Sequence, residues 1–175
     1  MPAQEYTPEN QTSVRHGDLR LPADQQALLT LLDLYARRLP GHMQPLPSVV
    51  AERLVPALLA QPGCRLFLAD TNGQATGLAV CFDGFSTFQA KPLLNIHDLA
   101  VHPQFQRQGI GDQLLAAVIA FAQQADYCAV TLEVAADNPA RRLYTRHGFQ
   151  SLSGPSASHL TLFGKLELCS TRANS

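Results

Sequence analysis

Apolar positions in the first third of the chain repeat at helical spacing. A short strand over Val14–Leu19 precedes them, and the pattern then predicts a helix that begins at Pro22–Asp24 and stops near Pro40–Gly41. A second helix is predicted over Ser48–Leu59, with the serine as its N-cap, and Pro56 is expected to shorten or kink it. The chain is thus expected to open with one strand and two helices.

Further along, the apolar positions change to the pattern of strands. The runs 66–69 and 76–82 are apolar and rich in β-formers, and between them lies Asp70-Thr71-Asn72-Gly73, which is typical of a tight hairpin turn. Two antiparallel strands are therefore predicted. The next segment, Gly84–Pro92, carries two phenylalanines and a lysine and is interpreted as a strand end or loop, which either contacts substrate or only packs its aromatic rings.

The strand predicted over Leu93–Val101 changes the side on which its apolar residues lie. Under strict alternation Leu94 and Ile96 share one side, whereas the apolar residues after His97 share the other. A β-bulge near His97–Leu99 would explain the change, because one extra residue shifts every later side chain to the opposite face. The bulge would also leave a main-chain N–H without a partner in the sheet.

The second half of the chain alternates strands with helices. Its predicted elements are, in order, a polar turn over 104–109, a helix with an apolar face of Leu114, Leu115, Val118, Ile119 and Ala122, a strand over 129–134, a helix over 139–147 that Gly148 ends, and strands over 149–152 and 160–168. A strand, helix and strand over 93–134 require parallel strands, whereas the earlier hairpin is antiparallel. The fold class is therefore α/β (α+β in some schemes), with a mixed, mostly antiparallel central sheet of six to seven strands flanked by about four helices.

Composition and charge narrow the class of partner. The 175 residues are 46% hydrophobic, as in an ordinary globular protein, and are expected to form one domain over 13–169, with a flexible leader over 1–12 and a frayed tail over 170–175. The net charge of −1 leaves no basic field for nucleic acid and no polybasic patch for a membrane. The N-terminus lacks the features of a secretory signal, so a cytoplasmic location is predicted.

The cysteines give no sign of a metal or redox site. Cys64, Cys81, Cys128 and Cys169 are widely spaced and form no CxxC pair. Neither a zinc site nor a thioredoxin-type motif is therefore indicated. We expect reduced, mostly buried thiols and no bound metal.

A glycine-rich turn joins the 93–101 strand to the following helix. It reads Gln106-Arg107-Gln108-Gly109-Ile110-Gly111. Glycines at this place permit positive φ and let a pyrophosphate approach the main chain, where free N–H groups and the helix dipole favour an anion. The pattern alone is weak, and a glycine-rich helix entry without a ligand is an equal alternative. A Rossmann fingerprint is excluded because Leu114 stands where it needs a third glycine.

Two stretches of the sequence resemble one family. Residues 99–111, followed by Leu114-Leu115, resemble motif A of the GNAT superfamily of acetyltransferases, whose loop reads Arg/Gln-x-x-Gly-x-Gly/Ala. Residues 132–149 are similar to its motif B, in which an Asn follows a strand and Ala-x-x-Leu-Tyr precedes Gly-Phe. The resemblance implies a GNAT-like fold with a splayed parallel pair of strands, and acetyl-CoA as the cosubstrate.

The same resemblance implies cofactor contacts residue by residue. The main chain of Leu99, Ala100 and Val101 would pair with the pantetheine arm as a neighbouring strand would. The pyrophosphate would lie on Gln106, Arg107, Gln108, Gly109, Ile110 and Gly111. Asn138 and Tyr144 would meet the cofactor near its thiol end.

Acetyl transfer to an amine needs a base for the ammonium proton, an N–H donor for the oxyanion and an acid for the leaving thiolate. Tyr144 suits the acid because its phenol titrates near the thiol range, and an aromatic lid on the core is the alternative. Three residues compete as the base. Glu133 matches a glutamate of some N-terminal acetylating members, and His97 and Asp98 lie where polyamine acetyltransferases carry an acidic pair. For each, a structural role with water as the proton relay is an equal alternative.

The sequence therefore predicts an N-acetyltransferase that moves the acetyl group of acetyl-CoA to a primary amine by direct attack in a ternary complex. The expected acceptor is a small molecule, such as a polyamine-like or amino compound. Protein or peptide N-termini and lysines are the alternative acceptors. A non-catalytic acyl-CoA-binding regulatory module is the alternative from another class. Whether the chain forms a homodimer stays open.

Overall fold

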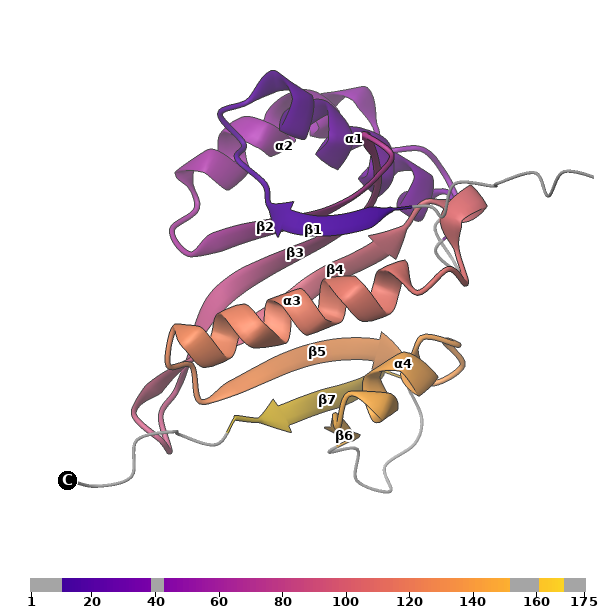
Figure 1. Ribbon diagram of the computed structural model, residues 1–175. Helices are drawn as coiled ribbons and strands as arrows, with labels where there is room; N and C mark the ends of the chain where they lie inside the picture. The colour runs from indigo at the N-terminus through magenta and orange to yellow at the C-terminus, as the bar shows by residue number, and fades with distance from the viewer. Residues whose placement is uncertain (1–10, 39–42, 152–160, 169–175) are drawn as a thin grey trace, which may run out of the picture.

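The computed structural model describes residues 11–38, 43–151 and 161–168. Its first part contains strand β1 and helices α1 and α2 (Figure 1), whose bounds are Thr12–His16, Pro22–Ala36 and Ser48–Ala60. The strand and two helices expected at the start of the chain are therefore present. Expectations that concern residues 1–10, 39–42, 152–160 and 169–175 lie outside the described residues.

Three details of this first part differ from the predictions. β1 begins earlier than expected and ends at His16, because the chain then leaves the sheet and buries Leu19 in the core. The prediction that Ser48 caps α2 is wrong, since Pro47 occupies the N-cap position and Ser48 is the first helical residue. Pro56 lies inside α2, which continues to Ala60, so the proline does not shorten the helix.

One sheet contains all seven strands of the described residues, in the order β1-β2-β3-β4-β5-β7-β6. The bounds of β2 to β7 are Cys64–Thr71, Gln74–Ser86, Lys91–Val101, Ala129–Ala135, Gln150–Ser151 and Thr161–Glu167. Neighbouring strands are antiparallel except β4 and β5, which are parallel. The predicted mixed, mostly antiparallel sheet is therefore confirmed.

Two further helices, α3 and α4, follow β4 and β5 in the chain. Their bounds are Ile110–Gln124 and Arg141–Arg146. Gly148 follows α4 with a φ of 84°, which confirms its predicted role as a left-handed helix end. In the described ranges, no helix is both long and apolar enough to cross a membrane.

The central strands are joined by two hairpins. Asn72 and Gly73 have φ of 52° and 82° at the β2–β3 turn, as a type I′ turn requires, so the predicted hairpin is confirmed. β3 then extends to Ser86, beyond the predicted end, and Gly84–Pro92 forms the end of a long hairpin with β4 instead of a loop. Phe88 at its tip is fully exposed, so the alternative that its ring packs on the core is wrong.

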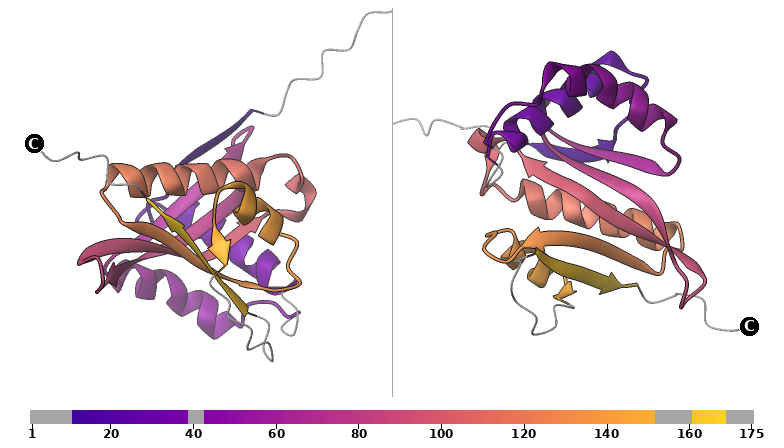
Figure 2. Two further views of the ribbon diagram at one scale, coloured as in Figure 1. Left: turned by 90° about the horizontal axis from the view of Figure 1, so that it is seen from below. Right: turned by 180° about the vertical axis from the view of Figure 1, so that it is seen from behind.

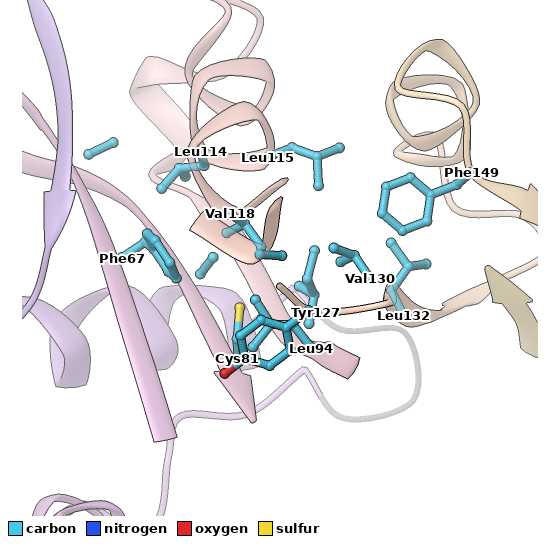
Figure 3. Packing of buried hydrophobic residues seen from close by; sticks show 14 of the residues in the cluster. Phe67, Cys81, Leu94, Leu114, Leu115, Val118, Tyr127, Val130, Leu132 and Phe149 are labelled. Carbon is cyan, nitrogen blue, oxygen red and sulfur yellow. The ribbon is translucent and has the colours of Figure 1, made fainter. Parts of the chain in front are cut away.

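The sheet separates two apolar cores. α3 covers one face, and the core beneath it includes Phe67, Leu94, Val118, Val130 and Leu132 (Figure 3). α1 and α2 cover the other face, where the core includes Leu28, Leu31, Leu66, Val80 and Ala100. Figure 2 shows these helices on opposite sides of the strands. We call the two cores the α3-side core and the α1-side core.

Candidate functional site

β4 and β5 run as paired strands only at their beginnings. The paired residues are Leu94 with Val130, Asn95 with Thr131, and Ile96 with Leu132. Beyond them, among the described strands, β4 pairs only with β3 and β5 only with β7, and the two ribbons diverge in Figure 1. The main-chain groups of 97–101 on the β5 side therefore lack a strand partner, and an extended ligand could pair with them.

A β-bulge at His97 separates the two halves of β4. Ile96 lies opposite Cys81 and Asp98 lies opposite Val80, so His97 is the extra residue. Cys81 belongs to the α3-side core and Val80 to the α1-side core. The bulge therefore turns Asp98 toward α1 and α2, whereas a regular strand would turn it into the α3-side core. The bulge predicted from the sequence is confirmed.

The loop between β4 and α3 has the backbone geometry of an anion site. Gly109 is the N-cap of α3 with a φ of 80°, and Arg107 has a φ of 62°. No side chain in the described part of the protein caps this helix start, so its first N–H groups remain available to a ligand. A Cβ at Gly109 would meet nothing within 4 Å. This glycine is thus required by its backbone conformation and not by crowding.

The side chains of the loop are divided between solvent and core. Gln106, Arg107 and Gln108 are exposed, whereas Ile110 is buried in the α3-side core and anchors the start of α3. Gln106 Nε2 donates to the Val101 carbonyl oxygen at 3.3 Å, which ties the loop to the end of β4. The loop therefore presents polar groups at the surface from an anchored backbone.

Basic residues at the end of α4 fasten this helix to the start of α3. Arg146 Nη2 donates to both carboxylate oxygens of Asp112, at 2.9 and 3.0 Å. His147 Nε2 lies 3.3 Å from Oδ1 of the same carboxylate. Gly111 adds to the fit, because a Cβ there would come within 3.3 Å of Leu143 Cδ2. The glycine-rich loop and α4 are thus held next to each other.

Asn138 lies before α4, and Tyr144 lies within this helix. Asn138 Oδ1 accepts the N–H of Ala140 at 2.9 Å, so a ligand would meet the NH2 group of this side chain. The Tyr144 ring packs on Phe149, with the ring centroids 5.9 Å apart. Burial and, secondly, the electrostatic interaction with Tyr35 raise the pKa of Tyr144 to about 12. Its phenol therefore stays protonated at neutral pH and can donate a hydrogen bond.

Two carboxylates lie on the same side of the sheet, on the diverging strands. Val130 and Leu132 face the α3-side core. Because successive side chains of a strand point to opposite faces, Glu133 faces the α1 side, as Asp98 does. Burial raises the pKa of Asp98, and the charge of the neighbouring His97 acts in the opposite direction. Glu133 is exposed. Asp98 is therefore the carboxylate with the more perturbed environment.

Two ring side chains lie near Asp98. His97 is exposed, and its ring meets Phe82 edge-on with the centroids 5.6 Å apart. Tyr35, on α1, packs against the α1-side core and interacts electrostatically with Asp98 and with Tyr144. Sequence reasoning missed Tyr35 because its spacing with the leucines of the same helix indicated only a core position. The hydroxyl at the end of an apolar helix face is the signal that could have found it.

Metal ligands do not cluster in the described ranges. No group of three or more His, Cys, Asp or Glu side chains there could hold a metal ion. Cys81 and Cys128 are buried free thiols, Cys64 is a half-buried one, and Cys169 lies outside the described residues.

Known proteins are similar to this chain in sequence or in fold. The model of the acetyltransferase (GNAT) family matches residues 28–149. An uncharacterized N-acetyltransferase of Archaeoglobus fulgidus is 33% identical over 89 residues, which are 50% of this chain and 60% of that protein. The match thus spans less than two thirds of that relative's length.

Two solved structures are similar in fold. The Salmonella typhimurium protein yncA, whose structure contains its cofactor acetyl-CoA, is 21% identical with a TM-score of 0.71, and the match covers 94% of this chain and 98% of that one. The ribosomal-protein-S18-alanine N-acetyltransferase of Escherichia coli is 19% identical with a TM-score of 0.65, over 90% and 94% of the two chains. The match to the family model covers more than half of this chain, including β4, the glycine-rich loop and α4. The chain therefore belongs to the acetyltransferase (GNAT) family.

Proposed function

We propose that this protein is an N-acetyltransferase that transfers the acetyl group of acetyl-CoA to a primary amine by direct attack in a ternary complex. The observation that carries the proposal is the divergence of β4 and β5 beside the uncapped start of α3. An unpaired main-chain edge beside a helix start that could bind an anion would suit CoA, which has both an amide-containing arm and a pyrophosphate. Family membership and the acetyl-CoA of the related yncA structure support the same cosubstrate.

The described residues fit both parts of this cosubstrate. Leu99–Val101 would pair through their main chain with the pantetheine amides, because their β5 side has no strand partner among the described residues. Gln106–Gly111 would hold the pyrophosphate on the N–H groups of the helix start. The NH2 group of Asn138 and the hydroxyl of Tyr144 would lie near the sulfur.

In direct transfer, one side chain accepts a proton from the amine and another donates a proton to the thiolate. The amine nitrogen attacks the thioester carbonyl carbon, its C–N bond forms, the C–S bond breaks, and the thiolate takes up a proton. Asp98 accepts the amine proton, since burial raises its pKa and makes it a better proton acceptor than an ordinary carboxylate. Tyr144 donates a proton to the sulfur. A main-chain N–H freed at the bulge would stabilise the oxyanion.

The α1 side of the sheet, where the amine acceptor would bind, carries negative charge. Asp98 and Glu133 face it from two strands, which favours a cationic small molecule such as a polyamine-like amine. A peptide N-terminus is the second candidate acceptor, because the structurally similar Escherichia coli protein acts on the alanine of a ribosomal protein. Glu133 and His97 are the alternative bases for either acceptor.

An amine panel tests the proposal. Thiol release from acetyl-CoA would be measured with diamines, amino sugars, lysine and an alanine-terminated peptide, and product masses would identify the acetylated compound. We expect release with at least one small amine, and a rise of the melting temperature with CoA. Stabilisation by CoA without release on any amine would favour the non-catalytic binding module. Absence of both effects would contradict the cosubstrate as well.

A further inference from the structure

Tyr35 lies in the last turn of α1, on the same side of the sheet as Asp98. Its side chain packs against the α1-side core, which contains Val80 and Ala100. Val80 is the residue that lies opposite Asp98 in the β3–β4 pairing. Because the bulge turns the carboxylate to this side, a phenol from α1 and a carboxylate from β4 are neighbours on one face of the sheet.

Tyr35 also interacts with Tyr144, the phenol proposed as the acid. It interacts electrostatically with Tyr144, which α4 holds beyond the diverging ends of β4 and β5, as well as with Asp98. The group proposed as base and the group proposed as acid therefore both have Tyr35 as a neighbour. An amine that moves from Asp98 toward the thioester would pass this hydroxyl.

The side-chain oxygens of these three residues find no hydrogen-bond partner within residues 11–38, 43–151 and 161–168. In the described part of the chain, none of Tyr35, Asp98 and Tyr144 forms a side-chain hydrogen bond or ion pair. The phenol of Tyr127, by contrast, donates to Asp83 Oδ1 at 2.7 Å. A partly buried tyrosine normally finds a partner for its hydroxyl, so the unused one at Tyr35 suits a ligand.

We propose that Tyr35 is a specificity-determining residue for the acceptor, whose hydroxyl oxygen accepts a hydrogen bond from one N–H of the amine while Asp98 accepts another. The inference rests on the proposed function. A primary amine carries two N–H groups when neutral, so it can satisfy both oxygens and still direct its lone pair at the thioester carbon. A neutral secondary amine carries one N–H and can satisfy only one of the two oxygens, so this pair of oxygens favours primary amines.

Steady-state kinetics of Tyr35→Phe test the proposal, with the amine on which the wild-type enzyme is most active. The substitution keeps the ring and its packing and removes only the hydroxyl. We expect the KM for the amine to rise about three- to tenfold, as for one lost hydrogen bond, with kcat within about twofold. The KM for acetyl-CoA and the stabilisation by CoA should not change. Tyr127→Phe is the matched control, because it removes a phenol hydroxyl outside this site and should leave both KM values as they are.

Three results would overturn the inference. An unchanged KM for the amine in Tyr35→Phe, with an active wild-type enzyme, would remove Tyr35 from the acceptor site and leave the proposed function intact. A rise of the KM for acetyl-CoA by the same factor would place the residue at the cofactor instead. A wild-type protein without acetyl transfer would contradict the proposed function first, and the inference with it. A melting temperature of Tyr35→Phe equal to that of the wild type would show that its packing is preserved.

Discussion

The two halves of β4 have opposite surroundings although they form one strand. Before the bulge, β4 pairs with β3 on one side and β5 on the other, and Leu94 and Ile96 are buried in the α3-side core. After His97, it pairs only with β3 among the described strands, and Asp98 faces α1. The first half therefore holds the fold together, and the second half has main-chain and side-chain groups left for a ligand.

A single extra residue produces this difference. The bulge changes the side on which later residues lie, and the divergence from β5 starts at the same place. Stability and chemistry are thus separated along one strand. Substitutions before the bulge should change the free energy of unfolding, and substitutions after it should change rates and binding.

The largest effect is expected in the second half, at Asp98. Asp98→Asn removes the proposed base, so kcat/KM for the amine should fall by about 10²- to 10⁴-fold, the range for general base catalysis. The measurement is thiol release from acetyl-CoA at saturating cosubstrate. Glu133→Gln is the matched control, a carboxylate on the same side of the sheet. A large loss in Glu133→Gln with little loss in Asp98→Asn would move the base to β5.

The same variant should be more stable than the wild type at neutral pH. Burial raises the pKa of Asp98 in the folded protein above its unfolded value, so the folded state binds this proton more tightly. The carboxyl therefore costs no stability below the unfolded pKa, and the cost appears as pH rises through the folded pKa. Melting temperatures measured from about pH 3 to about pH 8 should show an advantage of Asp98→Asn that grows with pH. An advantage that shrinks with pH would contradict the burial of this group.

The first half of the strand should show the reverse behaviour. Leu94 is fully buried in the α3-side core, so Leu94→Ala should lower the free energy of unfolding by about 2–5 kcal/mol. Urea unfolding gives this value, and kcat per folded molecule should stay within about twofold of the wild type. A variant of normal stability and low activity would show that the two halves are not separated in this way.

Sequence patterns predicted those parts of the fold that depend on neighbours along the chain. The change of side after His97 indicated the bulge, and Asn72-Gly73 indicated the hairpin, because each is a local property of the backbone. Helix starts were less certain. Ser48 has a good capping side chain, yet it is the first residue of the helix and Pro47 is the N-cap, so the cap prediction was wrong.

The acceptor side could not be predicted in the same way. Tyr35 has the helical spacing of a core residue, and its role depends on the packing of α1 over β4, which are far apart in the sequence. The proposed cofactor side would instead use main-chain groups that glycines and a bulge expose, and these leave motifs. Side chains that meet only through the tertiary fold leave none.

A smaller loss of activity than in Asp98→Asn is expected for a substitution of Tyr144, which lies in α4. Tyr144→Phe keeps the packing on Phe149 and removes the proposed acid, so kcat should fall about a hundredfold, the lower end of the range for general acid–base catalysis. Because the pKa of Tyr144 is about 12 and the acid must be protonated, its loss by titration comes only as pH rises through that value. The wild-type rate should therefore show no alkaline decline from this group up to about pH 10. A kcat in Tyr144→Phe equal to that of the wild type would leave the phenol a purely structural role.

The smallest effect is expected at the loop that follows β4. It is tested by comparing two glycines that have the same left-handed backbone conformation. Gly109 and Gly73 have φ of 80° and 82°, and a Cβ at either would meet nothing within 4 Å. Gly109→Ala and Gly73→Ala should therefore each cost about 1–2 kcal/mol of stability, from the left-handed backbone alone.

Only one of the two should affect the cosubstrate. Gly109 is the N-cap of the helix start that would hold the pyrophosphate, so Gly109→Ala should raise the Kd of CoA about three- to tenfold, as when an anion loses part of its contact with a helix N-terminus. Gly73 lies in the β2–β3 turn, so Gly73→Ala should leave this Kd unchanged. Isothermal titration with CoA measures both. Equal Kd values for the two variants would mean that the loop after β4 does not contact the phosphates, and the functional half of the strand would then end at Val101.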